Sequence, residues 1–301
     1  MNENEVKVNS LKAWMLATRP KTLIGAAVPV MIGTAMALRD SGWNINVMPL
    51  VLCFAFAFIM QIDANFVNDY FDFKRGNDDE TRLGPLRACA QGWITMRAMK
   101  SALIITTLLA CVAGLPLVLY GGYAMIFVGV TCLLFSILYT TRLSYIGMGD
   151  ILVLLFFGLV PVTMTYYLEM PMYMQGFTNE VIVASVACGM VIDTLLIVNN
   201  YRDIDNDRRA GKITLVVSIG PSVSRRLYLI VGFFACLMGL VFAFMGSYWA
   251  FVLPAIYLFF HVITYRKMVK IDKGSELNKI LGETARNIFF YGLLVSIGLL
   301  L

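Results

Sequence analysis

Nine long runs of apolar residues set the strongest limit on what this chain can fold into. Each is close to or above the roughly 17 residues of α-helix that are needed to cross about 30 Å of hydrocarbon. The runs are residues 22–38, 44–70, 101–120, 122–140, 150–168, 180–200, 227–246, 248–265 and 286–301. This pattern predicts an all-α, polytopic membrane protein with nine transmembrane helices, folded as a single domain over residues 1–301.

The composition also indicates that lipid is the solvent of this surface. Of the 301 residues, 59% are hydrophobic and 14% are charged, and the mean hydropathy is +0.76. A soluble domain carries roughly 25% charged residues, so the missing charge needs a non-aqueous surface to explain it. A globular core of this length could not bury so much apolar side chain.

The positive charge alternates along the chain. All of the 24 Lys and Arg residues except Arg39 fall before the first run or in every second loop. Because basic residues concentrate in cytoplasmic loops, we expect a multi-pass protein of the cell inner (cytoplasmic) membrane with its N-terminus inside and its C-terminus outside. No signal peptide is evident in residues 1–21, where Trp14 and its basic neighbours predict a short interfacial segment.

Carboxylates and amides gather at the ends of two runs. One cluster covers residues 61–72 and continues through 77–80, and the other covers residues 199–207. Such groups cost about 2.5–3.5 kcal/mol each at the middle of a membrane helix, so their positions carry information. Both ends are cytoplasmic by the charge argument, and the flanking segments 72–100 and 201–226 are predicted to be cytoplasmic active-site loops.

Helical spacing places three members of each cluster on one face. These are Asn65, Asp69 and Asp72 in the first cluster, and Asn200, Asp203 and Asp207 in the second. The two runs lie four helices apart, which predicts two four-helix halves plus a ninth helix. A pseudo-twofold repeat would bring the two clusters to one cavity.

Facing carboxylates need a cation, and oxygen ligands without His or Cys suit Mg²⁺. The neighbouring Arg and Lys would bind an anion such as diphosphate. The alternative is that these residues are solvated helix ends whose Asp side chains act as ordinary caps. Asp79, Glu80, Asp205 and Asn206 fall off the two faces, and we expect them to be solvated.

Two motifs resemble the signatures of the UbiA superfamily of intramembrane prenyltransferases. They read Asn65-Phe-Val-Asn68-Asp69-Tyr-Phe-Asp72 and Asp203-Ile-Asp-Asn-Asp207. Flanking segments, among them Gly84-Pro-Leu-Arg87 and Gln91-Gly-Trp-Ile-Thr95, resemble the branch that acts on 1,4-dihydroxy-2-naphthoate in menaquinone biosynthesis. The resemblance covers residues 14 to 220, and the remaining residues match only in hydropathy.

The resemblance implies a UbiA-like fold and Mg²⁺-dependent transfer of a polyprenyl group from an allylic diphosphate to the naphthoate, with loss of CO₂. It implies metal ligation by Asn65, Asn68, Asp69, Asp72, Asp78, Asn200, Asp203 and Asp207. It implies diphosphate binding by Lys21, Arg82, Arg87, Tyr139, Arg142, Arg202 and Lys212. The catalytic set is Asp69, Asp72, Asp203 and Asp207, with Asp193 as a further candidate. The expected partners are a polyprenyl diphosphate, an aromatic acceptor and the bilayer, without nucleic acid.

Three alternatives remain open from the sequence. The acceptor of an enzyme of this kind could be 4-hydroxybenzoate or another phenol. A membrane transporter also suits repeats and intramembrane polar residues. Asp193 lies deeper in its run than Asp203; it either hydrogen-bonds another helix, with Asp63 as a partner that shares its proton, or contacts the hydroxyl of the acceptor.

Overall fold

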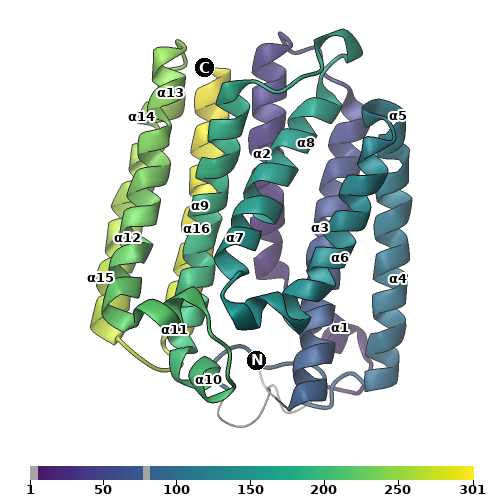
Figure 1. Cartoon of the computed structure of the whole chain (residues 1–301), viewed down its shortest axis with the longest axis vertical. Helices are drawn as coiled ribbons and strands as arrows, with labels where there is room; N and C mark the ends of the chain where they lie inside the picture. Colours follow the sequence, from purple (N-terminus) through teal and green to yellow (C-terminus); the bar gives the residue numbers. More distant parts are fainter. Residues whose placement is uncertain (1–5, 77–81) are drawn as a thin grey trace.

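The computed structural model describes residues 6–76 and 82–301, and every regular element within those ranges is helical, with no strand. The long helices run side by side along the longest axis of the molecule (Figure 1). The all-α class predicted from the apolar runs is confirmed.

The helices fall into two groups along the chain. The amino-terminal group comprises α1 (Leu11–Thr18), α2 (Leu23–Asp40), α3 (Val47–Arg75), α4 (Met96–Gly114), α5 (Val118–Gly121) and α6 (Ala124–Thr141). The carboxy-terminal group comprises α7 (Gly149–Val153), α8 (Val160–Glu169), α9 (Asn179–Arg202), α10 (Ile204–Arg209), α11 (Leu215–Ile219), α12 (Pro221–Met238), α13 (Leu240–Phe244), α14 (Trp249–Val252), α15 (Ala255–Ile271) and α16 (Leu277–Leu300).

Eight helical stretches in the described part of the chain are long and apolar enough to cross a membrane. They are Leu11–Asp40, Val47–Arg75, Met96–Gly121, Ala124–Thr141, Gly149–Glu169, Asn179–Arg202, Pro221–Phe244 and Trp249–Ile271. These match the first eight predicted runs. The ninth run, 286–301, overlaps α16 as far as Leu300. The first turns of α16 carry Lys279, Glu283 and Arg286, so the count of nine spans stays a prediction.

Some spans are interrupted, each for a local reason. Pro116 lies in the 3₁₀ turn that separates α4 from α5, because proline cannot continue the helical hydrogen bonding. Between α7 and α8, residues 154–159 form a π-helical turn that contains Gly158. A Cβ on Gly158 would lie 2.5 Å from the carbonyl oxygen of Ser185 and 2.7 Å from the Cα of Gly189, both in α9. Small residues therefore allow these two backbones to cross at close range.

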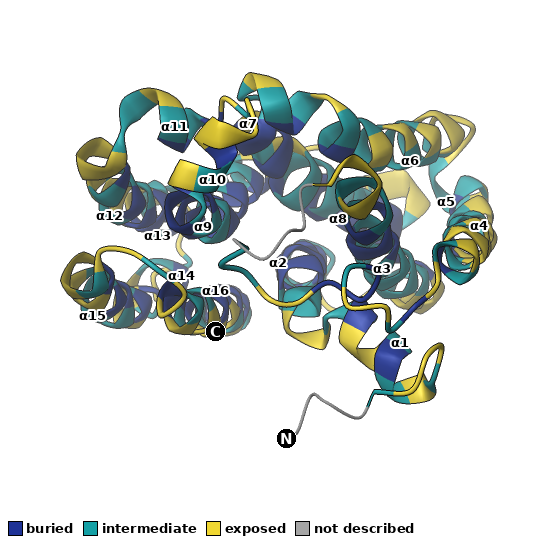
Figure 2. Cartoon of the chain, turned by 90° about the horizontal axis from the view of Figure 1, so that it is seen from below, coloured by how far each residue is buried: buried dark blue, intermediate teal, exposed yellow. Residues whose placement is uncertain are grey.

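Helix α9 is the centre of the bundle. In its apolar 18-residue stretch, 67% of the residues are buried inside the protein. Helix α9 packs against α2, α8, α12 and α16. In the apolar stretch of α6 only 6% of the residues are buried, and Phe127 and Val130 are exposed. Leu108 and Val112 of α4 are exposed as well. The outer helices turn their exposed faces away from the bundle (Figure 2). An apolar surface of this kind suits contact with lipid tails.

Helix α1 lies at one end of the bundle and has an exposed apolar face. Ala13 and Ala17 are buried in a cluster with Phe66 of α3, whereas Leu11 and Met15 are 79% and 58% exposed. This arrangement supports the interfacial segment predicted for the N-terminal residues, which remains a prediction.

The polar ends identified in the sequence lie at the same end of the molecule. The carboxyl ends of α3 and α9 meet α1, α10 and α11 there, and the carboxyl end of α16 lies at the opposite end (Figure 1). The predicted loop 72–100 is shorter than expected because α3 continues to Arg75 and α4 begins at Met96. The predicted loop 201–226 is largely helical, since it contains α10, α11 and the start of α12.

Candidate active site

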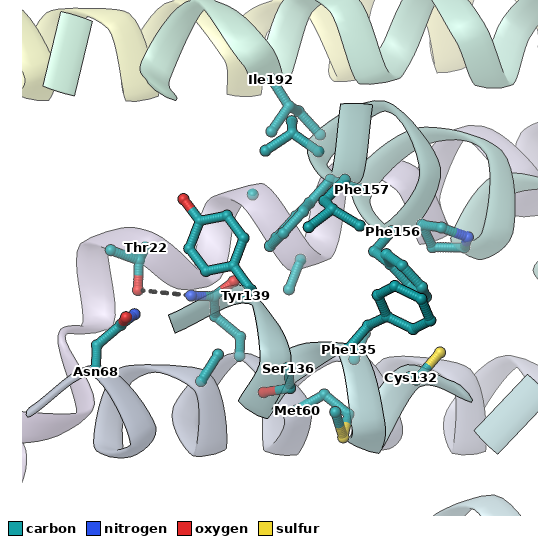
Figure 3. A pocket seen from close by; sticks show the side chains of 18 of the residues that line it. Thr22, Met60, Asn68, Cys132, Phe135, Ser136, Tyr139, Phe156, Phe157 and Ile192 are labelled. Atoms are coloured by element: carbon teal, nitrogen blue, oxygen red, sulfur yellow. Dashed lines mark hydrogen bonds between the residues drawn. The ribbon is translucent and has the colours of Figure 1, made fainter. Parts of the chain in front are cut away.

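A cavity of about 830 Å³ runs through the bundle and joins two chemical environments. Its apolar part is lined by Met60, Phe135, Phe156, Phe157 and Ile192 from four different segments (Figure 3). Its polar end is lined by residues of both acidic clusters and by several cations. These are Asn68, Asp72, Asn199, Asp203, Asn206 and Asp207, with Arg19, Lys21, Arg82, Arg87, Arg202 and Lys212. Some members of each cluster therefore line the same cavity.

The end of α3 contributes Asn68 and Asp72 to the cavity. Arg87 donates from Nη2 to Oδ2 of Asp72 at 2.9 Å. The hydroxyl of Thr140, from α6, donates to Oδ1 of Asn68 at 2.7 Å. Both side chains are therefore oriented by neighbours on other segments, which reduces the entropy lost when a ligand binds.

Asn65 and Asp69 have a different arrangement. The Asp69 carboxylate accepts hydrogen bonds from the backbone N–H groups of Ala88 and Cys89, at 2.9 and 2.8 Å, and Arg19 lies 3.8 Å away. The amide of Asn65 donates to the carbonyl oxygen of Thr18 and to the hydroxyl of Thr22, both at 2.9 Å. Neither side chain is among those that line the cavity. Asn65 thus connects α3 to the segment that contains Thr18 and Thr22, and Asp69 connects α3 to the segment that contains Ala88 and Cys89.

The predicted common faces therefore need correction. On α3 the residues toward the cavity include Gln61, Ala64, Asn68 and Asp72, rather than the face through Asn65 and Asp69. From the end of α9 through α10 the polar residues toward the cavity include Asn199, Asp203, Asn206 and Asp207, whereas Asn200 is buried and does not line it. Asn206, expected to be solvated, lines the cavity. The roles of these residues as metal ligands stay predictions, and Asp78 lies outside the described residues.

Arg202 hydrogen-bonds several side chains at the end of α9. Its guanidinium is 1% exposed and donates to both carboxylate oxygens of Asp203, at 2.9 Å from Nε and 2.5 Å from Nη2. It also donates to the side-chain carbonyl of Asn199 at 2.9 Å. A bidentate pair of this kind fixes the guanidinium plane as well as its position.

Asp207, in α10, is buried next to Lys212. The Lys212 ammonium lies 3.4 Å from Oδ1 of Asp207. Burial raises the pKa of the Asp207 carboxyl, Asp203 raises it further, and Lys212 and Arg202 oppose the rise. Within residues 6–76 and 82–301, Oδ2 of Asp207 is buried without a hydrogen-bond partner. A buried orphan oxygen of this kind is suited to a cation or a donor supplied by a ligand.

These residues fit a hard divalent cation that completes its shell with substrate oxygens. Among the described residues, no three His, Cys, Asp or Glu side chains cluster closely enough to enclose a metal on their own. Mg²⁺ typically takes one or two protein carboxylates and fills its remaining positions with waters and phosphate oxygens. Asp72, Asp203 and Asp207 offer such carboxylates around one end of the cavity.

Of the predicted diphosphate-binding residues, most reach the cavity. Lys21, Arg82, Arg87, Tyr139, Arg202 and Lys212 line it, whereas Arg142 is exposed and is not part of the lining. Arg19, Asn199 and Asn278 also line it and were absent from the predicted site. Arg19 could have been found from the basic segment in which it lies. No motif marks Asn278.

Asp193 does not pair with Asp63. The Asp63 carboxylate accepts from the hydroxyls of Thr106 and Thr107 in α4, at 2.5 and 3.3 Å. The electrostatic neighbour of Asp193 is instead Asp150, at the start of α7. The predicted Asp63–Asp193 pair is wrong, because the threonines of α4 take the position that the second carboxylate would need.

A helical bundle of this kind, whose cavity joins a charged end to an apolar body, defines a membrane-embedded site for a substrate with a polar head and an apolar tail. The sequence matches the UbiA prenyltransferase family over residues 26–293. The chain belongs to this family and is an enzyme that transfers prenyl groups.

Curated relatives agree with this assignment. A 1,4-dihydroxy-2-naphthoate octaprenyltransferase of Escherichia coli (strain K12) is 37% identical over 246 residues, covering 77% of each chain. The protein of the same name from Haemophilus influenzae is 32% identical over 314 aligned positions, covering 100% of both chains.

Solved structures support the fold alone. A UbiA homolog from Aeropyrum pernix K1 superposes with a TM-score of 0.68 at 14% identity, covering 93% of this chain and 97% of that one. A UbiA homolog from Archaeoglobus fulgidus, bound to GPP and Mg²⁺, has a TM-score of 0.62 at 14% identity, covering 94% and 99%. The arrangement of two four-helix halves plus a ninth helix stays a prediction.

Proposed function

We propose that this protein transfers a polyprenyl group from an allylic diphosphate to 1,4-dihydroxy-2-naphthoate, with loss of CO₂, in menaquinone biosynthesis. The observation that carries the transfer reaction is the cavity, which places carboxylates and cations at one end of a long apolar chamber. The choice of acceptor is supported by the names of the E. coli and H. influenzae relatives.

The polar end has the groups that diphosphate departure needs. Lys21, Arg82, Arg87, Arg202 and Lys212 would bind the phosphate oxygens and stabilise the charge that grows on them as the C–O bond breaks. Asp72, Asp203 and Asp207 would hold Mg²⁺, with Asn68 as a helper; the ion, when bound, neutralises the diphosphate as a Lewis acid. The binding roles of Asn65, Asp69, Asn200, Asp78 and Arg142 remain to be tested.

The aromatic residues beyond the polar end suit the allylic cation that forms next. Tyr139 directs its hydroxyl into the cavity, and the rings of Phe135 and Phe156 lie 5.2 Å apart behind it (Figure 3). Aromatic faces attract a cation and exclude water that would otherwise capture it.

The transfer step needs no general base. The C–O bond breaks first, and the diphosphate leaves with its electron pair. The carboxylated ring carbon of the naphthoate then attacks the allylic cation and forms the new C–C bond. The carboxylate then leaves as CO₂, and its C–C electron pair restores the aromatic ring. The product is demethylmenaquinone in its quinol state, whose tail can pass from the cavity into the bilayer.

The same proposal includes the location of the protein. The alternation of basic residues supports an inner-membrane protein with a cytoplasmic N-terminus and an external C-terminus. Nine spans, with α16 as the last, would place the two ends on opposite sides.

An acceptor panel tests the proposed function. Purified protein in detergent is given geranyl diphosphate, Mg²⁺ and either 1,4-dihydroxy-2-naphthoate or 4-hydroxybenzoate. We expect prenylated naphthoate with stoichiometric CO₂ and diphosphate, and no product after chelation of Mg²⁺. A preference for 4-hydroxybenzoate would overturn the choice of acceptor. Transport across vesicles without any transfer would overturn the enzyme assignment.

A further inference from the structure

Asn278, in the first turn of α16, joins two segments that are far apart in the sequence. Its Oδ1 accepts a hydrogen bond from Nη1 of Arg202 at 2.8 Å, and its Nδ2 donates to the carbonyl oxygen of Leu83 at 2.7 Å. A guanidinium only donates and a carbonyl only accepts, so this position needs both atoms of a side-chain amide. The hydrogen bonds point away from its own helix, whose first turn has no side-chain cap.

Gly84 gives an independent contact between the same segments. A Cβ at this position would lie 2.8 Å from Nη2 and 3.2 Å from Cζ of Arg202. The backbone at residues 83–84 therefore lies directly on the guanidinium, and only glycine allows this approach without displacement.

These contacts fix the start of a short active-site loop whose end is already fixed. Near the start of the loop 82–89, Leu83 and Gly84 contact Asn278 and Arg202. At its end, Asp69 accepts hydrogen bonds from the N–H groups of Ala88 and Cys89. Arg87 lies between the two attachments, and Arg82 directly precedes the first one; both line the cavity. The positions of the two cations thus depend on these attachments.

We propose that Asn278 is a positioning residue that holds the loop 82–89 over the end of α9, so that Arg82, Arg87 and Arg202 face the diphosphate together. This inference rests on the proposed function, because it assigns the site an allylic diphosphate. It places a determinant of diphosphate affinity in the last helix, outside both acidic motifs.

Steady-state kinetics with geranyl diphosphate and Mg²⁺ tests this. We expect Asn278→Ala and Gly84→Ala each to raise the KM for geranyl diphosphate by about tenfold, since each disturbs a charged hydrogen-bonded contact. The KM for the acceptor should stay within about twofold. Asn278→Gln, which presents the same carbonyl and amide, should recover much of the loss. The matched control is Lys279→Ala, whose side chain is 73% exposed and should leave both constants unchanged.

Limited trypsin cleavage after Arg82 and Arg87 gives a readout that needs no activity. Cleavage should be about tenfold faster in Asn278→Ala than in the wild type and unchanged in Lys279→Ala. An active wild type whose KM and cleavage rate are insensitive to both Asn278→Ala and Gly84→Ala would overturn the positioning role. An inactive wild type with faster cleavage in Asn278→Ala would retain the loop attachment and overturn the proposed function instead. If Asn278→Ala does not fold, Gly84→Ala tests the same attachment from the loop.

Discussion

The carboxyl ends of α3 and α9 carry similar sets of residues but are built differently. At the end of α3, Asp69 is saturated by backbone N–H groups and Asp72 is paired with Arg87. At the end of α9, Arg202 pairs with Asp203, whereas Asp207 keeps a buried oxygen without a partner in the described chain. Similar motifs therefore differ in structure: the α3 end anchors the loop 82–89 through Asp69, and the α9 end leaves a buried carboxylate oxygen on Asp207.

The largest expected effect comes from removing the carboxylate that each end presents to the cavity. Asp72→Ala and Asp203→Ala should each lower kcat/KM by roughly a thousandfold, because metal affinity and transition-state stabilisation are lost together. Turnover is measured at saturating Mg²⁺ on protein checked for folding. The control is Asp205→Ala, whose side chain is 62% exposed and which should have little effect. Near-normal turnover in either variant would refute the site assignment.

The next effect distinguishes the anchor from the ligands. Asp69→Ala leaves the N–H groups of Ala88 and Cys89 without their acceptor, so it should lower the free energy of unfolding by about 3 kcal/mol. Asp69→Asn keeps one acceptor oxygen and should lose about half as much. Thermal unfolding in detergent, without Mg²⁺, measures this. Loss of activity with unchanged unfolding would instead place Asp69 among the metal ligands.

Asp207 should make the α9 end sensitive to pH. Because burial raises its pKa, the folded protein binds more protons than the unfolded chain between the ordinary Asp pKa of about 4 and the raised value. Its contribution to stability should therefore decrease as pH rises through this window. The melting temperature measured against pH without Mg²⁺ should show this decrease, and Asp207→Asn should remove it.

Mg²⁺ should act in the opposite direction. Binding favours the ionised carboxylate, so stabilisation of the wild type by Mg²⁺ should increase as pH rises through the same window. An equal Mg²⁺ effect in Asp207→Asn would show that another group is responsible.

The spans were predictable from the sequence because lipid imposes a simple rule on apolar length. The run 44–70, for example, matches α3, which begins at Val47 and extends to Arg75. The π-helical turn at residues 154–159 was not predictable, since it depends on the contact of Gly158 with Gly189, a pair brought together only by the fold. The short helix around Trp14 was predictable because Trp14 with the basic residues Lys12 and Arg19 is typical of a segment at the membrane interface.

The sequence identified many of the residues of the site but not the direction in which their helix faces point. Helical spacing identifies residues that share a face, and Asp72, Asp203 and Asp207 do line one cavity. It does not give the direction of that face, which depends on how α1 and the loop 82–89 pack against α3. Asn65 and Asp69 were therefore assigned to the cavity although they bind these segments. Asn278 was missed because its role arises from a contact 76 residues away in sequence.

The smallest expected effect concerns Asp193, which belongs to neither end. Asp150 is its electrostatic neighbour, and in the described part of the chain both Asp150 oxygens and Oδ1 of Asp193 are buried without hydrogen-bond partners. Asp193→Asn removes the ionisable group and adds an N–H₂ group that can donate to Asp150. We expect turnover at saturating substrates within about twofold of the wild type and a slightly higher melting temperature. Asp150→Asn is the matched variant and should behave in the same way. A tenfold or larger fall in turnover confined to Asp193→Asn would make Asp193 a group that acts on the acceptor hydroxyl, and would extend the reactive region beyond the two ends.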